Sequence, residues 1–116
     1  MFQTKLFKLF IKLAIIVCAI YPTVFAQSNK NFQIILTEAR AKTTAKDWVE
    51  AAKLWEEVVR INPVESKFWR QLAVVRYSAK DYKKAISAFE RLLELGGDVP
   101  PSTLYNIATC FALLDD

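Results

Sequence analysis

The sequence predicts an all-α fold: a right-handed series of about two and a half helical hairpins after an N-terminal signal peptide. Three observations support this prediction. The chain contains a 34-residue internal repeat, its apolar residues recur at helical spacing between recognisable helix caps, and its N-terminal segment has the composition of a secretory signal. No segment shows a strand pattern that competes with these helices.

Residues 1–26 have the three-part plan of a signal peptide. Three lysines and no acid open the chain, an uninterrupted apolar run (LAIIVCAI) follows, and Pro22 comes just after that run. Cleavage is expected after Ala26, and residues 27–30 (QSNK) then form a short polar linker. The alternative is a membrane anchor. The apolar stretch up to Ala26 has 14 residues, whereas a spanning helix needs about 20.

Helical spacing and breaker residues divide the rest of the chain. Asp47 and Asp81 stand where helix N-caps belong, and Pro63 ends the helix before it. Gly96 supplies a left-handed helix terminus without a Cβ penalty, and Pro101 opens the last helix. The five helices are expected over residues 31–45, 48–61, 66–78, 82–95 and 102–114.

A shift of 34 residues places residues 45–63 on residues 79–97. Five positions are then identical and five more keep an aromatic or aliphatic side chain. The segment before each copy also has a helical pattern. Two related helical hairpins are the simplest explanation, with a third that begins near residue 102.

These residues resemble the tetratricopeptide repeat (TPR) family, whose unit is a helix A, a tight turn and a helix B. The resemblance covers about residues 31–116. The third unit begins one residue later than the 34-residue period places it. Glu38 departs from the pattern, because the family places a leucine there. The residues that match the family pattern are Ile35, Ala39, Ala51, Trp55, Val58 and Pro63 in the first unit, Trp69, Leu72, Ala73, Ala85, Phe89 and Leu92 in the second, and Leu104, Ile107 and Ala108 in the third.

The residue types of this pattern suit close packing between helices. Small side chains let helices A and B approach, and aromatic side chains fill the space between neighbouring hairpins. We therefore expect core roles for Ala51, Ala73, Ala85 and Ala108, and for Trp55, Trp69 and Phe89.

The third unit has a helix A but no helix B before the sequence stops. Asp116 aligns with Asp47 and Asp81, the expected caps of helix B in the first two units. An apolar face is then left without its cover, which predicts either a chain that continues further or a docking face. We favour the former. The residues of this face are Leu104, Ile107, Phe111 and Leu114.

Composition argues against several kinds of chemistry. The absence of histidine rules out imidazole bases and His-ligated metals, and no serine or carboxylate pair has catalytic surroundings. We expect no enzyme activity in this segment, no metal and no cofactor. After the signal, 13 basic and 12 acidic residues leave a net charge of +1, which does not favour nucleic acid. Cys110 is then the single cysteine, and we expect it to be buried.

The TPR resemblance implies a concave groove, lined by helix A of each repeat, that holds a peptide or partner helix. Arg40, Arg70 and Tyr77 would give this groove a basic and aromatic strip that favours an acidic or carboxylate-bearing peptide. The alternative is a solvated surface without a ligand. The strongest groove candidates are Arg40, Arg70, Val74, Tyr77 and Tyr105, and the other mapped places are Gln33, Leu36, Lys67, Ser102 and Asn106.

The sequence thus predicts a non-catalytic protein-interaction module of an exported protein. A signal peptide without disulfides favours a bacterial periplasm or secretion, with no membrane contact after cleavage. One alternative is the N-terminal helical part of a larger secreted enzyme, whose catalytic domain lies beyond residue 116. The other is a structural role in self-association through the open third repeat.

Overall fold

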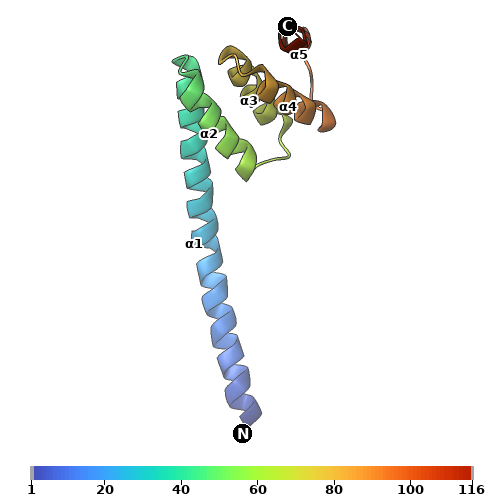
Figure 1. Cartoon of the computed structure of the whole chain (residues 1–116). Helices are drawn as coiled ribbons and strands as arrows, with labels where there is room; N and C mark the ends of the chain where they lie inside the picture. The colour runs from blue at the N-terminus through green and yellow to red at the C-terminus, as the bar shows by residue number, and fades with distance from the viewer. Residues whose placement is uncertain (1, 116) are drawn as a thin grey trace. The chain divides into compact units, whose positions relative to one another are not determined.

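The computed structural model describes residues 2–115, and in that range the chain forms five helices and no strand (Figure 1). The chain divides into two compact units, Met1–Gln33 and Ile34–Asp116, which are described separately. The expected all-α class is therefore confirmed. The helices are α1 (Phe2–Thr44), α2 (Trp48–Ile61), α3 (Ser66–Ser78), α4 (Tyr82–Glu94) and α5 (Pro101–Asp115).

The described residues of the first unit belong entirely to α1. The helix passes through Pro22 and through residues 27–30, so this segment is not an irregular linker and no new helix begins at residue 31. The reason is that residues 23–44 contain neither glycine nor proline, so nothing interrupts the helix. Among the described helices, α1 is long and apolar enough to cross a membrane, a test that signal sequences also pass.

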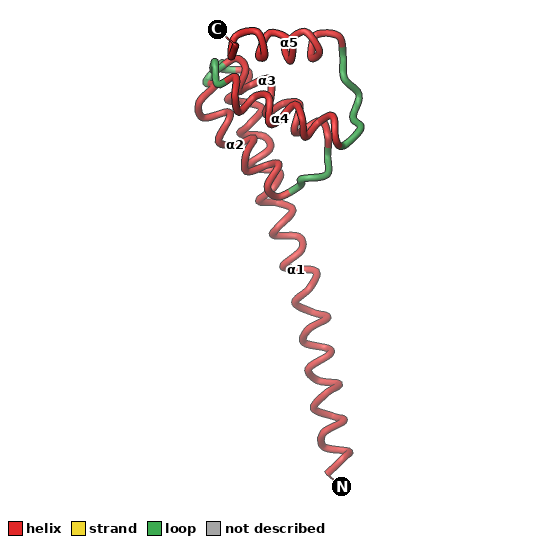
Figure 2. Tube along the Cα trace, turned by 45° about the vertical axis from the view of Figure 1, so that its right-hand side comes forward, coloured by secondary structure: helices red, strands yellow, loops and turns green. Residues whose placement is uncertain are grey.

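In the second unit, α2, α3 and α4 lie side by side in chain order, and α5 packs on α4 and α3 (Figures 1 and 2). The bounds of these four helices lie within one residue of the expected ones. The prediction succeeds because the caps are local signals. Asp47 accepts a hydrogen bond from the Glu50 amide, and Asp81 accepts one from the Lys84 amide.

The two tight turns before α2 and α4 have the same backbone geometry, 34 residues apart. Lys46 and Lys80 both adopt a left-handed conformation, with φ of 58° and 62°. The next amide in each turn donates a hydrogen bond five residues back. Asp47 donates to the Lys42 carbonyl (3.0 Å) and Asp81 to the Arg76 carbonyl (2.9 Å). Both turns are therefore the Schellman type of helix end, although a lysine stands where glycine is usual.

Small and aromatic side chains form the core of the second unit, largely as expected. Ala51, Ala73 and Ala85 have no exposed surface, and Trp55 and Phe89 are buried beside them. Ala51 and Trp55 of α2 occupy the places equivalent to Ala85 and Phe89 of α4, so the two helices bury the same face. Fully buried alanines allow neighbouring helix backbones to approach closely.

Two of the expected core roles are wrong. Trp69 is only half-buried, and its indole N–H donates to the Pro63 carbonyl at 2.8 Å. The buried aromatic residue of α3 is its neighbour Phe68. The sequence did not distinguish the two, because either of two adjacent large aromatics can face the core of a helix. Ala108 is exposed, since no described helix covers its side of α5.

The end of α1 also differs from the family pattern. Leu36 and Ala39 are its buried residues, and Glu38 is exposed. Leu36 was expected to line the groove, so that placement is wrong. Leu36 and Ala39 are three residues apart and therefore share the buried face of α1. Glu38 lies on another side of the helix, where its charge is exposed to solvent.

Arg76 of α3 forms hydrogen bonds with both neighbouring helices, α2 and α4. One guanidinium nitrogen donates to Glu56 of α2 at 2.7 Å, and the other donates to the Lys84 carbonyl of α4 at 3.2 Å. The Arg76 side chain is 14% exposed. Its Nε atom has no hydrogen-bond partner among the described residues. The pair with Glu56 is therefore more shielded than the other ion pairs of the chain.

The connection between α4 and α5 depends on its two glycines. Gly96 has a φ of +66°, which confirms the expected left-handed terminus. Gly97 lies against the start of α3. A Cβ added there would be 2.6 Å from the Cβ of Ser66, closer than real contacts allow. A side chain at position 97 would thus push this loop away from α3.

Helix α5 buries little of its surface. Thr103 and Cys110 are its buried residues, and the burial of Cys110 was expected. Leu104, Phe111 and Leu114 are exposed and Ile107 is half-buried, as predicted for an uncovered face. The predicted cap role of Asp116 lies outside the described residues.

Lys80→Gly is expected to stabilise the protein. A left-handed lysine carries a steric penalty that glycine does not, and this gain exceeds the extra entropy that glycine loses on folding. We expect the free energy of unfolding to rise by about 0.5–1 kcal/mol. Urea unfolding measures it, with Lys80→Ala as the matched control that removes the charge but keeps the Cβ. Equal stability of the two variants would contradict the explanation.

Cys110 should make stability depend on pH above the ordinary range of a thiol. Burial raises the pKa of the Cys110 thiol above its usual 9.0, so the folded chain holds this proton more tightly than the unfolded chain does. The resulting stabilisation is complete below pH 9.0 and is lost as the pH rises through the higher, folded pKa. The stability difference between wild type and Cys110→Ala should therefore shrink from pH 7 to pH 10.5. A constant difference would refute this assignment.

Candidate functional site

A cleft in the second unit lies between the C-terminal end of α1 and the N-terminal end of α3, over α2. It has a volume of about 430 Å³, which lies within the range of small-ligand sites. We call it the cationic cleft. Its lining residues are Arg40, Thr43 and Thr44 of α1, Trp55 of α2, and Lys67, Phe68, Arg70 and Gln71 of α3.

The floor of the cationic cleft is aromatic. Trp55 is 2% exposed and Phe68 is 6% exposed, and their ring centroids are 6.1 Å apart. The indole N–H of Trp55 donates to the hydroxyl of Thr43 at 2.8 Å, and that hydroxyl donates to the Ala39 carbonyl at 2.8 Å. The indole N–H is thus already satisfied, and only a small part of either ring reaches the cleft.

The rim of the cleft carries three cations and no acidic side chain. Arg40 is exposed and forms no side-chain hydrogen bond or ion pair with any residue in 2–115. Arg70 donates to the Asp98 carbonyl at 3.4 Å, which leaves its charge without a carboxylate partner in the same range. Lys67 lies 3.7 Å from a carboxylate oxygen of Glu65 and 5.4 Å from the centre of the Phe68 ring. The rim therefore has more positive charge than its neighbours neutralise.

A smaller hollow of about 160 Å³ lies on the other side of Arg70. It shares Lys67 and Arg70 with the cationic cleft and adds Ser66, Leu92 and Asp98. Asp98 brings negative charge to this hollow. It is therefore less suited to an anionic ligand than the cationic cleft is.

The structure divides the predicted groove residues. Arg40 and Arg70 line the same cleft, as does Lys67. Val74 is half-buried, further along α3 and outside the cleft. Tyr77 is also half-buried and packs edge-to-face on Tyr82, with ring centroids 5.8 Å apart.

The remaining predicted places lie elsewhere. Tyr105 is 70% exposed on α5, where Ser102 is exposed and Asn106 is half-buried. Gln33 is exposed and belongs to the first unit. The expected strip of Arg40, Arg70 and Tyr77 is thus not continuous.

Sequence reasoning missed five lining residues of the cleft. Trp55 was assigned to the core alone, and Phe68 was passed over for Trp69. Thr43 and Thr44 stand three and four residues after Arg40, and Gln71 stands four after Lys67. That spacing places each set on one helix face and could have indicated them.

The described residues offer little for metal or redox chemistry. No three His, Cys, Asp or Glu side chains come together within residues 2–115 in a way that could hold a metal ion. Cys18 is exposed on α1, and Cys110 is buried in α5. The cleft combines a largely buried aromatic floor with positive charge that no carboxylate in its lining neutralises.

Comparison of the chain with family models, with curated proteins and with solved structures gave no match.

Proposed function

We propose that residues 34–116 form a TPR-like solenoid that serves as a non-catalytic interaction module and binds a peptide or partner helix at the cationic cleft. The single observation that carries the proposal is the cleft itself. Three cations converge on an aromatic floor, and no acid lines the same space. A ligand that combines a carboxylate with an apolar side chain would match both parts.

The repeat interpretation is supported by geometry as well as by sequence. The turns at Lys46 and Lys80 share their backbone conformation, and the side chains of Asp47 and Asp81 cap the following helices in the same way. Equivalent positions of α2 and α4 are also buried alike. Such repetition is typical of stacked helical hairpins.

The position of the cleft supports binding at the first helices of the hairpins. Arg40 comes from α1, whereas Lys67 and Arg70 come from α3. In this proposal the acidic group of a ligand contacts these three cations, while an apolar side chain lies over the small part of Trp55 and Phe68 that lines the cleft. Arginine pairs with carboxylates through two parallel hydrogen bonds, which would fix the orientation of the bound segment.

We also propose that the protein is exported, to a bacterial periplasm or beyond the cell, after cleavage following Ala26. The support is the positive start and the apolar run of the N-terminal segment. None of its apolar window is buried within the chain. In this proposal the binding module leaves the membrane once the segment is removed.

Charge reversal in the cleft is expected to weaken peptide binding. The probes are labelled hexapeptides that carry two glutamates and one aromatic or aliphatic side chain, and fluorescence anisotropy gives the Kd. Arg40→Glu and Arg70→Glu should each raise the Kd about tenfold or more, because an attractive contact becomes a repulsive one.

The matched control is Lys83→Glu, a charge reversal at an exposed site of α4 outside the cleft. It should leave the Kd unchanged, and peptides with glutamine in place of glutamate should bind weakly to every form. Equal affinity of wild type, Arg40→Glu and Arg70→Glu would eliminate the cleft as the binding site.

The exported chain is expected to begin at Gln27. Intact-mass measurement of protein recovered from the periplasm or medium of an expressing bacterium identifies the N-terminus. Ala26→Arg should block processing, because signal cleavage requires a small residue before the cut. Recovery of wild-type chain that still begins at Met1, in the membrane fraction, would mean that α1 is kept as an anchor.

A further inference from the structure

The connection between α4 and α5 contacts one arginine of the cationic cleft from outside the cleft. The main-chain carbonyl of Asp98, within that connection, accepts a hydrogen bond from the Arg70 guanidinium at 3.4 Å. Asp98 lines the smaller hollow but not the cleft, whereas Arg70 lines both. The carbonyl therefore meets Arg70 on the side that faces away from the cleft.

The two arginines of the cleft differ in how they are held. Arg40 is exposed, and its side chain forms no hydrogen bond or ion pair with any residue in 2–115. Arg70 gives one N–H of its guanidinium to the Asp98 carbonyl, and a guanidinium has five such donors. The remaining donors suffice for a carboxylate in the cleft to accept two parallel hydrogen bonds. Arg70 is thus oriented without losing its charge or its capacity to bind.

The position of Asp98 depends on the glycine before it. Gly97 lies against Ser66 at the start of α3. A Cβ added to Gly97 would be 2.6 Å from both the Cβ and the Oγ of Ser66, and 3.0 Å from the Cδ1 of Leu92. The Ser66 Cβ is bonded to the helix backbone, so it cannot rotate away. A residue with a side chain at position 97 would have to withdraw from α3 until this contact reached about 3.4 Å.

The hydrogen bond from Arg70 tolerates little movement of this kind. Its length of 3.4 Å is close to the outer limit, since a separation of about 3.6 Å is no longer a hydrogen bond. Asp98 follows Gly97 directly, so a withdrawal of the chain at position 97 carries the carbonyl away from α3. The missing Cβ of Gly97 therefore determines whether Arg70 is held.

The neighbouring glycine has a different structural role. Gly96 has a φ of +66°, but a Cβ added there would meet nothing within 4 Å. A side chain at position 96 would strain the backbone without pressing on α3. The two glycines of the connection can therefore be distinguished by experiment.

We propose that Gly97 is a positioning residue of the cationic cleft. Because it has no side chain, the α4–α5 connection packs against Ser66, and the Asp98 carbonyl fixes the Arg70 guanidinium in place for a carboxylate. Binding then does not have to order this long side chain, which lowers the entropy cost of association. The inference rests on the proposed function of the cleft, to which it adds a further residue.

Substitution of each glycine tests the positioning role. Gly97→Ala should raise the Kd of the glutamate-containing hexapeptides about two- to tenfold, the cost of ordering one long side chain. Gly96→Ala is the matched control. It should lower the free energy of unfolding, because alanine is strained at a positive φ, but leave the Kd unchanged. Circular dichroism and urea unfolding check that both variants are folded.

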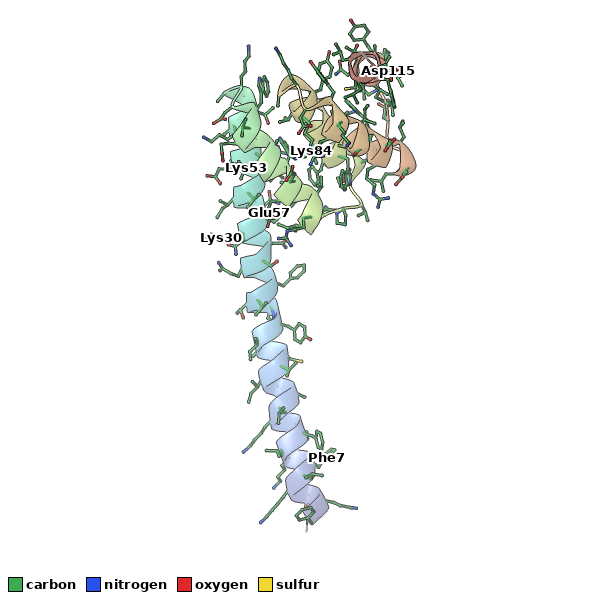
Figure 3. The ribbon with its side chains drawn as sticks, viewed as in Figure 1. Phe7, Lys30, Lys53, Glu57, Lys84 and Asp115 are labelled. Carbon is green, nitrogen blue, oxygen red and sulfur yellow. The ribbon has the colours of Figure 1, made fainter. Side chains whose placement is uncertain are left out.

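The effect of Gly97→Ala should require Arg70. It should disappear when Gly97→Ala is combined with Arg70→Ala, but remain complete in combination with Arg40→Ala. It should also remain complete with Lys53→Ala, which removes an exposed cation of α2 outside the cleft (Figure 3). A purely structural effect of the new methyl group would be the same in all three backgrounds, and that result would refute the proposal.

A second pair of variants avoids the contact with Ser66 and decides the question if Gly97→Ala does not fold. Asp98→Asn and Asp98→Gly remove the same charge at an exposed position, but only glycine loosens the main chain that carries the carbonyl. Asp98→Gly should therefore bind about threefold more weakly than Asp98→Asn.

The outcomes separate this inference from the proposed function. Failure of the wild-type chain to bind the peptides would overturn the proposed function, and the positioning role with it. Binding that is weakened by Arg70→Glu but is unaffected by Gly97→Ala and equal for the two Asp98 variants would overturn the positioning role alone.

Discussion

The close approach of helices at fully buried alanines is the constraint on which the second unit depends. Ala39, Ala51, Ala73 and Ala85 have no exposed surface. A larger side chain at these places would separate the helices, because a close-packed core has no space to accept it. The same approach brings the ends of α1 and α3 within reach of Trp55.

The helices of the second unit could be predicted from sequence because their boundaries are local. Asp47, Asp81 and Gly96 act within one turn of their own positions, so a single chain reveals them. The start of α1 could not be predicted in this way. A polar stretch at residues 27–30 indicates a change of environment but contains nothing that stops a helix. Composition and helix termination are separate signals, and here they do not coincide.

The cleft could be predicted only in part. Arg40 and Arg70 were indicated because each falls on a groove place of a first helix, but their aromatic floor was not. The reason is that Trp55 serves both as core and as floor, so burial alone suggests only the first role. Tyr77 illustrates the opposite case. Its place on α3 suggested the groove. Its ring instead packs edge-to-face on Tyr82, across the turn between α3 and α4.

Arg76 has a consequence for how this chain unfolds. Its guanidinium contacts α2 and α4 at once, so the two hairpins share one shielded charge. If α2 moved away alone, Arg76 would lose Glu56 while α4 still covered part of its side chain. Repeat proteins often lose their units one at a time, with intermediates between. In this chain the shared arginine links the two hairpins, which favours their opening together.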